Sequence, residues 1–228
     1  MTDKRTHILG AIASLALAAC ATSGPPTIDT SGEQTYDGLY PVRNSAADDA
    51  WAREGLDLSG YTKVRLESMG IEYRPGGESS TMWAVRRSST GPYEITPEGK
   101  ASFEALVREV VLEELAKGQR YTIVNEDGPD VLLVRGGLLD VVSFVPPDTV
   151  GRTDVYLRSV GEATLVLELR DSVTNAILAR AVDRRAAERP GGDLQWSNTV
   201  SNAAEVRRLA RRWATRLVEG LEEFMGPQ

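Results

Sequence analysis

Histidine and cysteine are almost absent from this chain of 228 residues, which contains one histidine, His7, and one cysteine, Cys20. Both lie within the first 20 residues, so the rest of the chain offers neither an imidazole nor a thiol. Ser-His-Asp hydrolysis, histidine-assisted proton transfer and zinc sites built from histidine or cysteine all require such groups. We therefore expect a non-enzymatic protein with no cofactor, no metal centre and no disulfide.

The chain also lacks an apolar run long enough to cross a membrane. Its longest such run, residues 8–19, has about half of the roughly 20 residues that a membrane-spanning helix needs. The run follows Lys4 and Arg5 and is closed by small residues, which is typical of a signal peptide. Its last residues, Leu17-Ala18-Ala19, and the following Cys20 resemble the lipobox of bacterial lipoproteins. The alternative is an incidental cysteine behind an ordinary cleavage site.

Resemblance to the lipobox implies cleavage before Cys20, a diacylglyceryl group on its sulfur and an acyl chain such as palmitate on its amine. Each buried methylene contributes about 0.8 kcal/mol, so several chains give a long-lived membrane anchor. In diderm bacteria a small neutral residue after the cysteine, here Ala21, is associated with transfer to the outer membrane. We expect a lipid-anchored protein at the periplasmic face of that membrane.

A shortage of positive charge argues against one class of partner. The chain has 26 Lys and Arg against 33 Asp and Glu, a formal net charge of -7 and a pI near 5.0. Nucleic-acid binding relies on a surplus of basic side chains, so we expect no nucleic-acid partner. The expected partners are the membrane, through the anchor, and another envelope protein. The oligomeric state stays open.

Composition divides the chain into three parts. Residues 1–19 are expected to form the signal peptide, residues 20–35 a flexible tether, and residues 36–228 a single domain. The tether from Ala21 onward is rich in Ala, Thr, Ser, Gly and Pro, and Ile28 is its one large apolar residue. Such a segment cannot bury enough surface to order itself.

Hydrophobic periodicity predicts the strands of this domain. Residues 36–60 are rich in turn formers and are expected to be irregular. Alternating or β-branched runs predict strands at residues 61–73, 121–124, 131–142, 162–170 and 177–185. The last two strands read as an antiparallel hairpin. The pair Gly136-Gly137 predicts a bulge or a close backbone crossing.

Two helices complete the predicted fold. One starts at Thr96-Pro97-Glu98, with a capping threonine and a proline in the first turn, and runs to Gly118. The other extends from about Asn198 to Met225 with an apolar stripe along one side. The order β-α-β-β-β-β-α indicates an α+β fold, with a mainly antiparallel sheet of about five strands and two helices on one face.

Three stretches of the chain resemble a known family. They are Tyr36-Asp37-Gly38-Leu39, the run at residues 55–64, and Asp171-Ser172-Val173-Thr174 before Ile177-Leu178-Ala179. They are similar to proteobacterial lipoproteins that bear domain of unknown function 3313. Asn175 stands where members usually carry glycine, a mild departure because asparagine also tolerates positive φ. The resemblance implies an α+β envelope lipoprotein and carries over no catalytic residue, because the family has no established activity.

Carboxylates are the remaining candidates for catalysis. Asp48 and Asp49 are adjacent on a segment expected to be irregular, and Asp140 and Asp154 lie in the strand at 131–142 and in the loop after it. Adjacency does not fix the separation that a glycosidase acid and nucleophile require. Solvated turns and ion pairs are the simpler interpretation, so we assign no catalytic residue.

A long loop supplies the first candidate partner contact. Residues 78–93 contain Trp83, Arg86, Arg87 and Tyr93, a mixture that is enriched in binding patches. Loops of this length are usually functional or disordered. The alternative is that Trp83 and its neighbours form an edge strand or fold onto the core.

The basic face of the last helix supplies the second candidate. Its members are Arg207, Arg208, Arg211, Arg212 and Arg216, of which Arg208, Arg211 and Arg212 are the leading candidates for partner contact. They occupy the first half of the helix, the reverse of what the helix dipole favours. Lipid phosphates, an acidic partner, or Glu113 and Glu114 of the neighbouring helix are candidate contacts; a solvated face with local ion pairs is the other interpretation.

Three functions stay open on these grounds. The leading hypothesis is a non-catalytic accessory or adaptor lipoprotein that presents an α+β domain in the periplasm. The alternative is a binding module for lipid, glycan or peptidoglycan fragments. A carboxylate-based hydrolase is the least favoured, because it needs an enclosed pocket with two facing acids.

Overall fold

The computed structural model describes residues 25–75, 92–146 and 155–225. Within these ranges the fold contains one large sheet, a small two-stranded sheet and two long helices. The helices are α2 (Pro97–Leu115) and α3 (Thr199–Phe224). The strands of the large sheet are β1 (Thr27–Ile28), β2 (Tyr40–Arg43), β3 (Asp49–Ala52), β4 (Lys63–Tyr73), β5 (Thr122–Val124), β6 (Val131–Ser143), β8 (Ser159–Asp171) and β9 (Ile177–Glu188). The small sheet pairs β7 (Tyr156–Leu157) with β10 (Gln195–Trp196).

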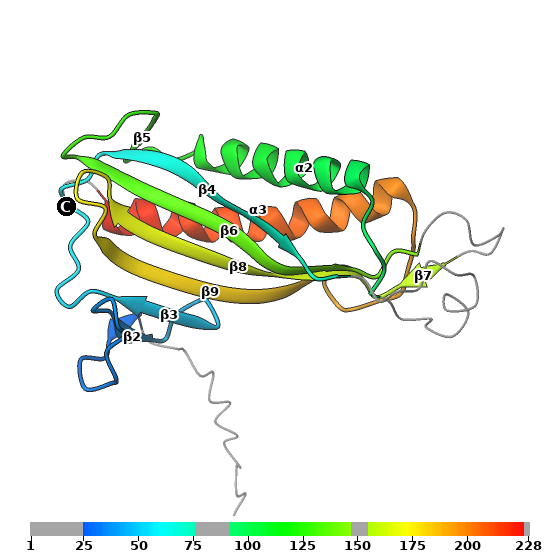
Figure 1. The fold of residues 1–228 in the computed structure, drawn as a ribbon, viewed down its shortest axis with the longest axis horizontal. Coiled ribbons are helices and arrows are strands. Elements are labelled where there is room, and N and C mark those ends of the chain that lie inside the picture. The colour runs from blue at the N-terminus through cyan, green and yellow to red at the C-terminus, as the bar shows by residue number, and fades with distance from the viewer. Residues whose placement is uncertain (1–24, 76–91, 147–154, 226–228) are drawn as a thin grey trace, which may run out of the picture.

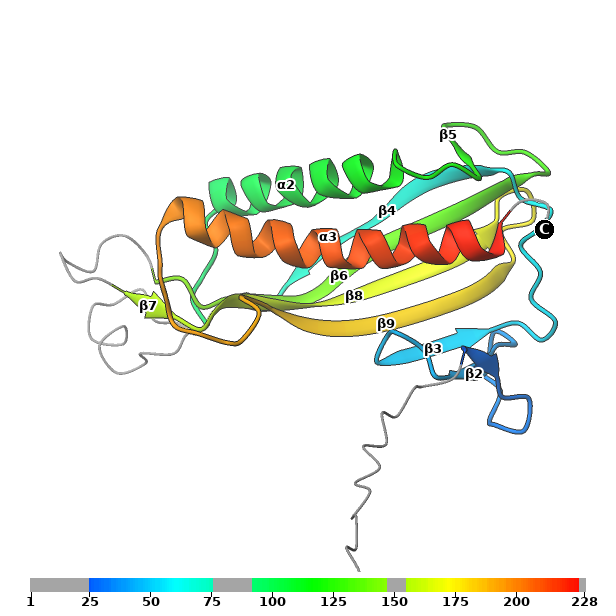
Figure 2. The same ribbon diagram turned by 180° about the vertical axis from the view of Figure 1, so that it is seen from behind.

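The two helices lie on the same face of the large sheet, as predicted for this α+β fold. Figure 1 views the sheet from the opposite face, and Figure 2 shows α3 crossing the strands with α2 beside it, over the edge that carries β4 and β5. None of the helices in the described part of the chain is long and apolar enough to cross a bilayer.

The prediction of about five mainly antiparallel strands is too low in number and leaves out the parallel part of what is a mixed sheet. The sheet has eight strands among the described residues, in the order β1-β2-β3-β9-β8-β6-β4-β5, and β4 pairs in parallel with both β5 and β6. The reason is the helix between them. A strand that leaves through a crossover helix is followed by a strand running in the same direction, so β4-α2-β5-β6 gives parallel pairs.

The added strands come from segments that were expected to be irregular. β3 pairs with β9 along Asp49–Ala52, and β2 pairs with β3. β1 pairs with β2, and Arg43 donates to Asp29 through Nε at 2.9 Å, so regular structure begins before residue 36, inside the expected tether. These strands have two to four residues, which is too short for a clear alternation of polar and apolar side chains.

Both predicted helix starts are confirmed by their caps. The Thr96 side chain accepts a hydrogen bond from the Gly99 N–H, and Pro97 occupies the first turn of α2. Asn198 and Ser201 form a reciprocal capping box at the start of α3. These contacts satisfy N–H groups that have no partner within the helix. They fix where each helix begins over the sheet.

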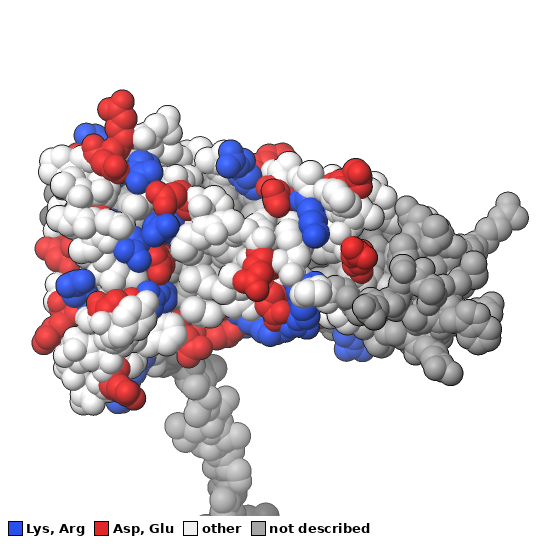
Figure 3. Space-filling view, in the orientation of Figure 1, with Lys and Arg blue, Asp and Glu red and all other residues white. Residues whose placement is uncertain are grey.

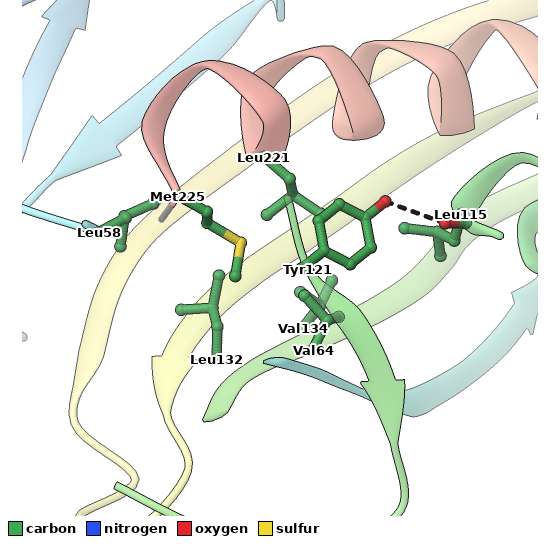
Figure 4. Packing of buried hydrophobic residues seen from close by; sticks show 8 residues of the cluster. All are labelled: Leu58, Val64, Leu115, Tyr121, Leu132, Val134, Leu221 and Met225. Carbon is green, nitrogen blue, oxygen red and sulfur yellow. Dashed lines mark hydrogen bonds between the residues drawn. The ribbon is translucent and has the colours of Figure 1, made fainter. Parts of the chain in front are cut away.

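The core is divided into two clusters between the helices and the sheet. The first core cluster, shown in Figure 4, gathers Leu58, Val64, Leu115, Tyr121, Leu132, Val134, Leu221 and Met225. Within it the Tyr121 hydroxyl donates to the Leu115 carbonyl at 3.1 Å, so its one polar group is satisfied. The second core cluster is formed by Leu138, Val141, Ala163 and Trp213. The interval between the two clusters is the hollow described next.

Candidate functional site

A missing side chain in the middle of β6 creates a hollow beneath the helices. Successive residues of a strand point to opposite faces, so Leu132, Val134, Gly136 and Leu138 share the helix side. Leu132 and Val134 belong to the first core cluster and Leu138 to the second, whereas Gly136 contributes no side chain. A Cβ built on Gly136 would have Leu167 Cδ1, at 3.9 Å, as its nearest neighbour. The sheet therefore has room for several more atoms at this point.

The helix above the hollow is also built from small residues. Ala210 and Ala214 of α3 are buried and line it, together with Trp213. The Trp213 indole Nε1 donates to Asp183 Oδ2 at 2.7 Å, which fixes the ring and satisfies its donor. The result is a cavity of about 560 Å³ between α2, α3 and the sheet, with a mostly apolar lining.

The cavity opens between α2 and the β4–β5 edge of the sheet. α2 lines it with Glu104, Val107, Arg108, Val111 and Leu112, residues that recur at helical spacing. Across from them stand Ser68 of β4 and the segment 123–125 at the end of β5. Leu112 is 44% exposed and Ile123 is 40% exposed, so apolar surface continues out to the solvent. We call this rim the mouth of the cavity.

β5 leaves part of this edge uncovered. It pairs only with Lys63, Val64 and Arg65 of β4. Beyond Arg65, β4 has no further strand on that side within residues 25–75, 92–146 and 155–225. The cavity is therefore accessible from the edge of the sheet.

The mouth carries few charged side chains, and two of them, Lys100 and Glu104, interact with Tyr73. Glu104 accepts a hydrogen bond from the Tyr73 hydroxyl at 3.5 Å, and Lys100 Nζ lies 4.9 Å from the centroid of the Tyr73 ring. Burial, with a further contribution from the Glu104 charge, raises the pKa of Tyr73 to about 12, so the phenol keeps its proton. Arg108 is exposed and makes no ion pair within the described part of the chain.

Glu67 also borders the cavity but does not place a second acid in it. It follows Leu66 on β4, so its side chain points to the opposite face of the sheet. There its carboxylate pairs with Arg135, 2.9 Å from Nε, and with Arg65, 3.3 Å from Nη2. Glu104 is thus not faced by the carboxylate of Glu67, and the arrangement of two facing acids needed for glycoside hydrolysis is not formed by this pair.

The face of the sheet turned away from the helices has a different character. Figure 3 shows acidic and basic side chains interspersed over it. The buried Glu168 pairs with Arg170 at 2.9 Å and with Arg180 at 3.2 Å, and Arg180 also pairs with Asp37. Burial alone would raise the pKa of Glu168, but the hydrogen bonds and charges of the two arginines outweigh it and lower that pKa. These charges neutralise one another and stabilise the sheet.

Two of the acidic candidates from the sequence, Asp48 and Asp140, form structural ion pairs, and Asp49 begins β3. Asp48 Oδ2 accepts from the Arg184 N–H at 2.9 Å, and Asp48 pairs with Arg185 at 3.2 Å. Asp140 has a positive φ of 56° and pairs with Arg74 and Arg184. A hydrogen bond from Arg74 lowers the pKa of Asp140. Within the described part of the chain, no group of three His, Cys, Asp or Glu side chains is arranged to hold a metal ion.

The loop proposed as a partner contact falls mostly outside the description. Trp83, Arg86 and Arg87 lie outside the described residues, as do Cys20 and Asp154. Tyr93 is described: its N–H donates to the Ser143 carbonyl at 2.8 Å in an isolated bridge next to β6. Contact between this loop and a partner stays a prediction.

Two arginines of the last helix, Arg207 and Arg211, face α2. α2 and α3 run in the same direction, as Figure 2 shows, and Arg211 Nε lies 2.9 Å from Glu114 Oε1 while its Nη2 lies 3.5 Å from Glu113 Oε2. Of the contacts considered from the sequence, the one with Glu113 and Glu114 is present. This contact accounts for arginines in the first half of α3, where the helix dipole disfavours them, because Arg207 and Arg211 lie beside carboxylates of α2. A hydrogen bond from Lys117, joined by one from Arg211, lowers the pKa of Glu114.

The remaining arginines of this face differ in their contacts. Arg208 pairs with Glu205, one turn earlier, and Arg207 lies 3.3 Å from Glu109. Arg212 is exposed and has no ion pair within the described ranges. Whether Arg208, Arg211 and Arg212 also contact a partner stays a prediction.

Sequence reasoning identified the unusual position in β6 but missed the cavity. The pair Gly136-Gly137 predicted a bulge or a close crossing, and β4 has a register shift between Ser68 and Gly70, opposite these glycines. A Cβ at Gly137 would lie 3.0 Å from Met69 Cβ, so the close crossing is confirmed there. The available signal for the cavity was a glycine within an otherwise large apolar stripe on one face of a strand.

Comparison with known proteins gives one match of sequence. The model of a family described as "Protein of unknown function (DUF3313)" matches residues 30–217. No curated protein matches the chain.

Solved structures of low identity match most of the chain. The PelC dodecamer from Paraburkholderia phytofirmans is 13% identical with a TM-score of 0.36, over 78% of this chain and 98% of that one. Protein XCC0632 from Xanthomonas campestris is 11% identical with a TM-score of 0.44, over 76% and 90%. A neuraminyllactose-binding hemagglutinin homolog from Helicobacter pylori is 9% identical with a TM-score of 0.37, over 73% and 86%. All three TM-scores are below 0.5.

Proposed function

The chain belongs to the family described as "Protein of unknown function (DUF3313)", and we propose that it is a non-catalytic accessory protein that works as a binding module for an apolar ligand. The observation that carries this proposal is the cavity of about 560 Å³ between the helices and the sheet. Its volume falls within the roughly 300–1,000 Å³ that is common for ligand sites, and such sites are mostly apolar with a few polar groups.

The hollow is too large to be ordinary looseness of packing. Protein interiors are close-packed, and a void beside buried side chains lowers stability. Here the hollow is formed by small residues on two elements at once, Gly136 on β6 and Ala210 with Ala214 on α3. Larger apolar residues at these positions would join the two core clusters. A ligand that fills the space would supply the van der Waals contacts that larger side chains at these positions would otherwise make.

A lipid anchor is the second part of the proposal. The basic start, the short apolar run and the lipobox-like residues before Cys20 support attachment at the periplasmic face of the outer membrane. A Cys20→Ala variant is expected to lose membrane association in fractionated cells while keeping its fold. Retention of that variant in washed membranes would contradict the anchor and leave the cavity proposal standing.

The cavity is tested by filling it. We expect a neutral apolar dye, N-phenyl-1-naphthylamine, to bind the purified protein saturably, with one site per chain. Gly136→Leu adds a side chain at a point where the nearest atom to a new Cβ is 3.9 Å away, and should lower dye affinity at least tenfold. Fluorescence titration measures both.

A matched control uses the same substitution on α3. Gly220 has nothing within 4 Å of a new Cβ and does not line the cavity, so Gly220→Leu should bind the dye as the unmodified protein does. If the unmodified protein shows no saturable binding, or if Gly136→Leu and Gly220→Leu bind alike, the proposed function is wrong. Circular dichroism confirms that both variants are folded.

A further inference from the structure

The polar groups at the mouth are arranged asymmetrically about an apolar interior. Toward the base the lining is Trp213, Ala210, Ala214 and Leu138, all buried, and the Trp213 donor is already bound to Asp183. At the mouth lie Arg108, Ser68 and Asn125. A ligand that satisfies both parts is apolar along most of its length and polar at one end.

The charge at the mouth indicates the sign of that polar end. Lys100, Glu104 and Arg108 follow one another at four-residue steps on α2, so they lie along one side of the helix. Glu104 lies between two cations and accepts from Tyr73, whereas Arg108 has no ion pair among the described residues. The neighbouring Glu109 is engaged by Arg207. Lys100 also has no ion pair among the described residues, but it lies over the Tyr73 ring and does not line the cavity. Arg108 is therefore the cation of the cavity lining, and it has no ion pair in the described part of the chain.

Two neutral polar side chains, those of Ser68 and Asn125, line the cavity together with Arg108. The Ser68 hydroxyl oxygen accepts from the Gly70 N–H at 3.1 Å, which leaves its own O–H to donate. Asn125 is exposed, and its side chain makes no hydrogen bond in the described part of the chain. A guanidinium with a hydroxyl and an amide is a donor set suited to carboxylate or phosphate oxygens.

We propose that the ligand is an amphiphile with one flexible aliphatic chain and one anionic head group. Its chain lies over Gly136 beneath Ala210 and Ala214, and its head group binds Arg108 at the mouth. This inference rests on the proposed function, since it names the ligand class of the same cavity. Fatty acids and lysophospholipids share this chemistry.

An aliphatic chain fits the interior better than a peptide does. Peptide N–H and C=O groups removed from water cost free energy unless they find hydrogen-bond partners. The base of the cavity is lined by Leu138, Leu165, Leu167, Ala210 and Ala214, whose side chains offer none. A methylene chain has no polar groups that need hydrogen-bond partners, and it is flexible enough to follow a hollow between two core clusters.

The experiment compares ligands that differ only at the head. Dodecanoate, dodecanol and a twelve-carbon lysophosphatidylglycerol are titrated below their micelle concentrations into the purified protein, by displacement of the dye. Three proteins are compared: the unmodified chain, Arg108→Gln and Arg120→Gln. Arg120 is also exposed and without an ion pair in the described ranges, but it does not line the cavity.

We expect at least one anion to bind the unmodified protein about tenfold more tightly than dodecanol. Arg108→Gln should remove that advantage and leave dodecanol unchanged, and Arg120→Gln should have neither effect. The anion that keeps the larger advantage identifies the source, a free fatty acid or a lysophospholipid. Equal affinities for anions and alcohol, or an advantage that survives in Arg108→Gln, would overturn the inference while the proposed function stands. If none of the three ligands displaces a bound dye, the inference is wrong while the proposed function stands; if the dye itself does not bind, both are wrong.

Discussion

Two parts of the helix–sheet interface are built from the same strands and the same helix but differ in packing. One is filled by side chains, and the other contains the cavity. Where Leu132 and Val134 meet Leu221 and Met225, the space is filled and most of these side chains are fully buried. Two residues further along β6, Gly136 meets Ala210 and Ala214, and a cavity of about 560 Å³ separates the layers. This difference fits the proposed function, in which the filled part stabilises the fold and the hollow part binds a ligand.

The two parts should differ most in the free energy of unfolding that is lost when a large side chain is removed. Leu132→Ala should lower the free energy of unfolding by about 2–5 kcal/mol, because it leaves a void in a fully packed region. Leu112→Ala, at the mouth, should cost less than about 1 kcal/mol, since that side chain is already 44% exposed. Urea denaturation of both variants measures the difference. Equal losses would mean that the mouth supports the fold as much as the core does.

Sequence patterns were sufficient for the elements that carry strong local signals. Thr96 with Pro97 located α2, the apolar stripe from about Asn198 to Met225 located α3, and the alternation at 162–170 located β8. The parallel pairing was missed although the strand–helix–strand order implied it. β1, β2 and β3 were missed because their pairing depends on the open edge of β9, a tertiary contact that no local pattern records.

The candidate site was harder to predict, for a physical reason. A glycine in a strand has several explanations, and only the position of α3 above Gly136 turns the missing side chain into a cavity. Arg108 looks like any helical arginine in the sequence. Its lack of a counterion becomes visible once Glu109 is seen to pair with Arg207. The same contacts show that Arg211, singled out for its charge, faces α2.

Two strand glycines, Gly161 and Gly136, should respond in opposite ways to an added side-chain atom. A Cβ at Gly161 of β8 would lie 2.2 Å from the Val142 carbonyl oxygen, so Gly161→Ala should destabilise by about 1–3 kcal/mol. Gly136→Ala meets no such contact and should stabilise by about 0.4–1 kcal/mol, because it restricts the unfolded chain. Thermal and urea unfolding give the two signs. A loss of stability in Gly136→Ala would mean that the hollow is not open to added atoms.

The charged face of the sheet, behind both parts of the interface, should give an effect that depends on pH. Glu168→Gln keeps the shape but loses the charge that pairs with Arg170 and Arg180, and should cost about 1 kcal/mol at pH 7. Because the arginines lower the pKa of Glu168 in the folded state, its contribution is complete above the ordinary value of 4.5 and is lost as the pH falls through the folded pKa.

The free energies of unfolding of Glu168→Gln and the unmodified protein should therefore converge in acid, as a denaturant series from pH 7 to pH 3 would show. A difference that stays constant over that range would mean that the pairing is not what stabilises this face. Ligand affinity should stay unchanged in the same variant, since the side chains of Glu168 and Leu167 point to opposite faces of β8 and only Leu167 lines the cavity. If Glu168→Gln lowers stability but leaves ligand affinity unchanged, the ion pairs of this face stabilise the sheet without contributing to the binding site.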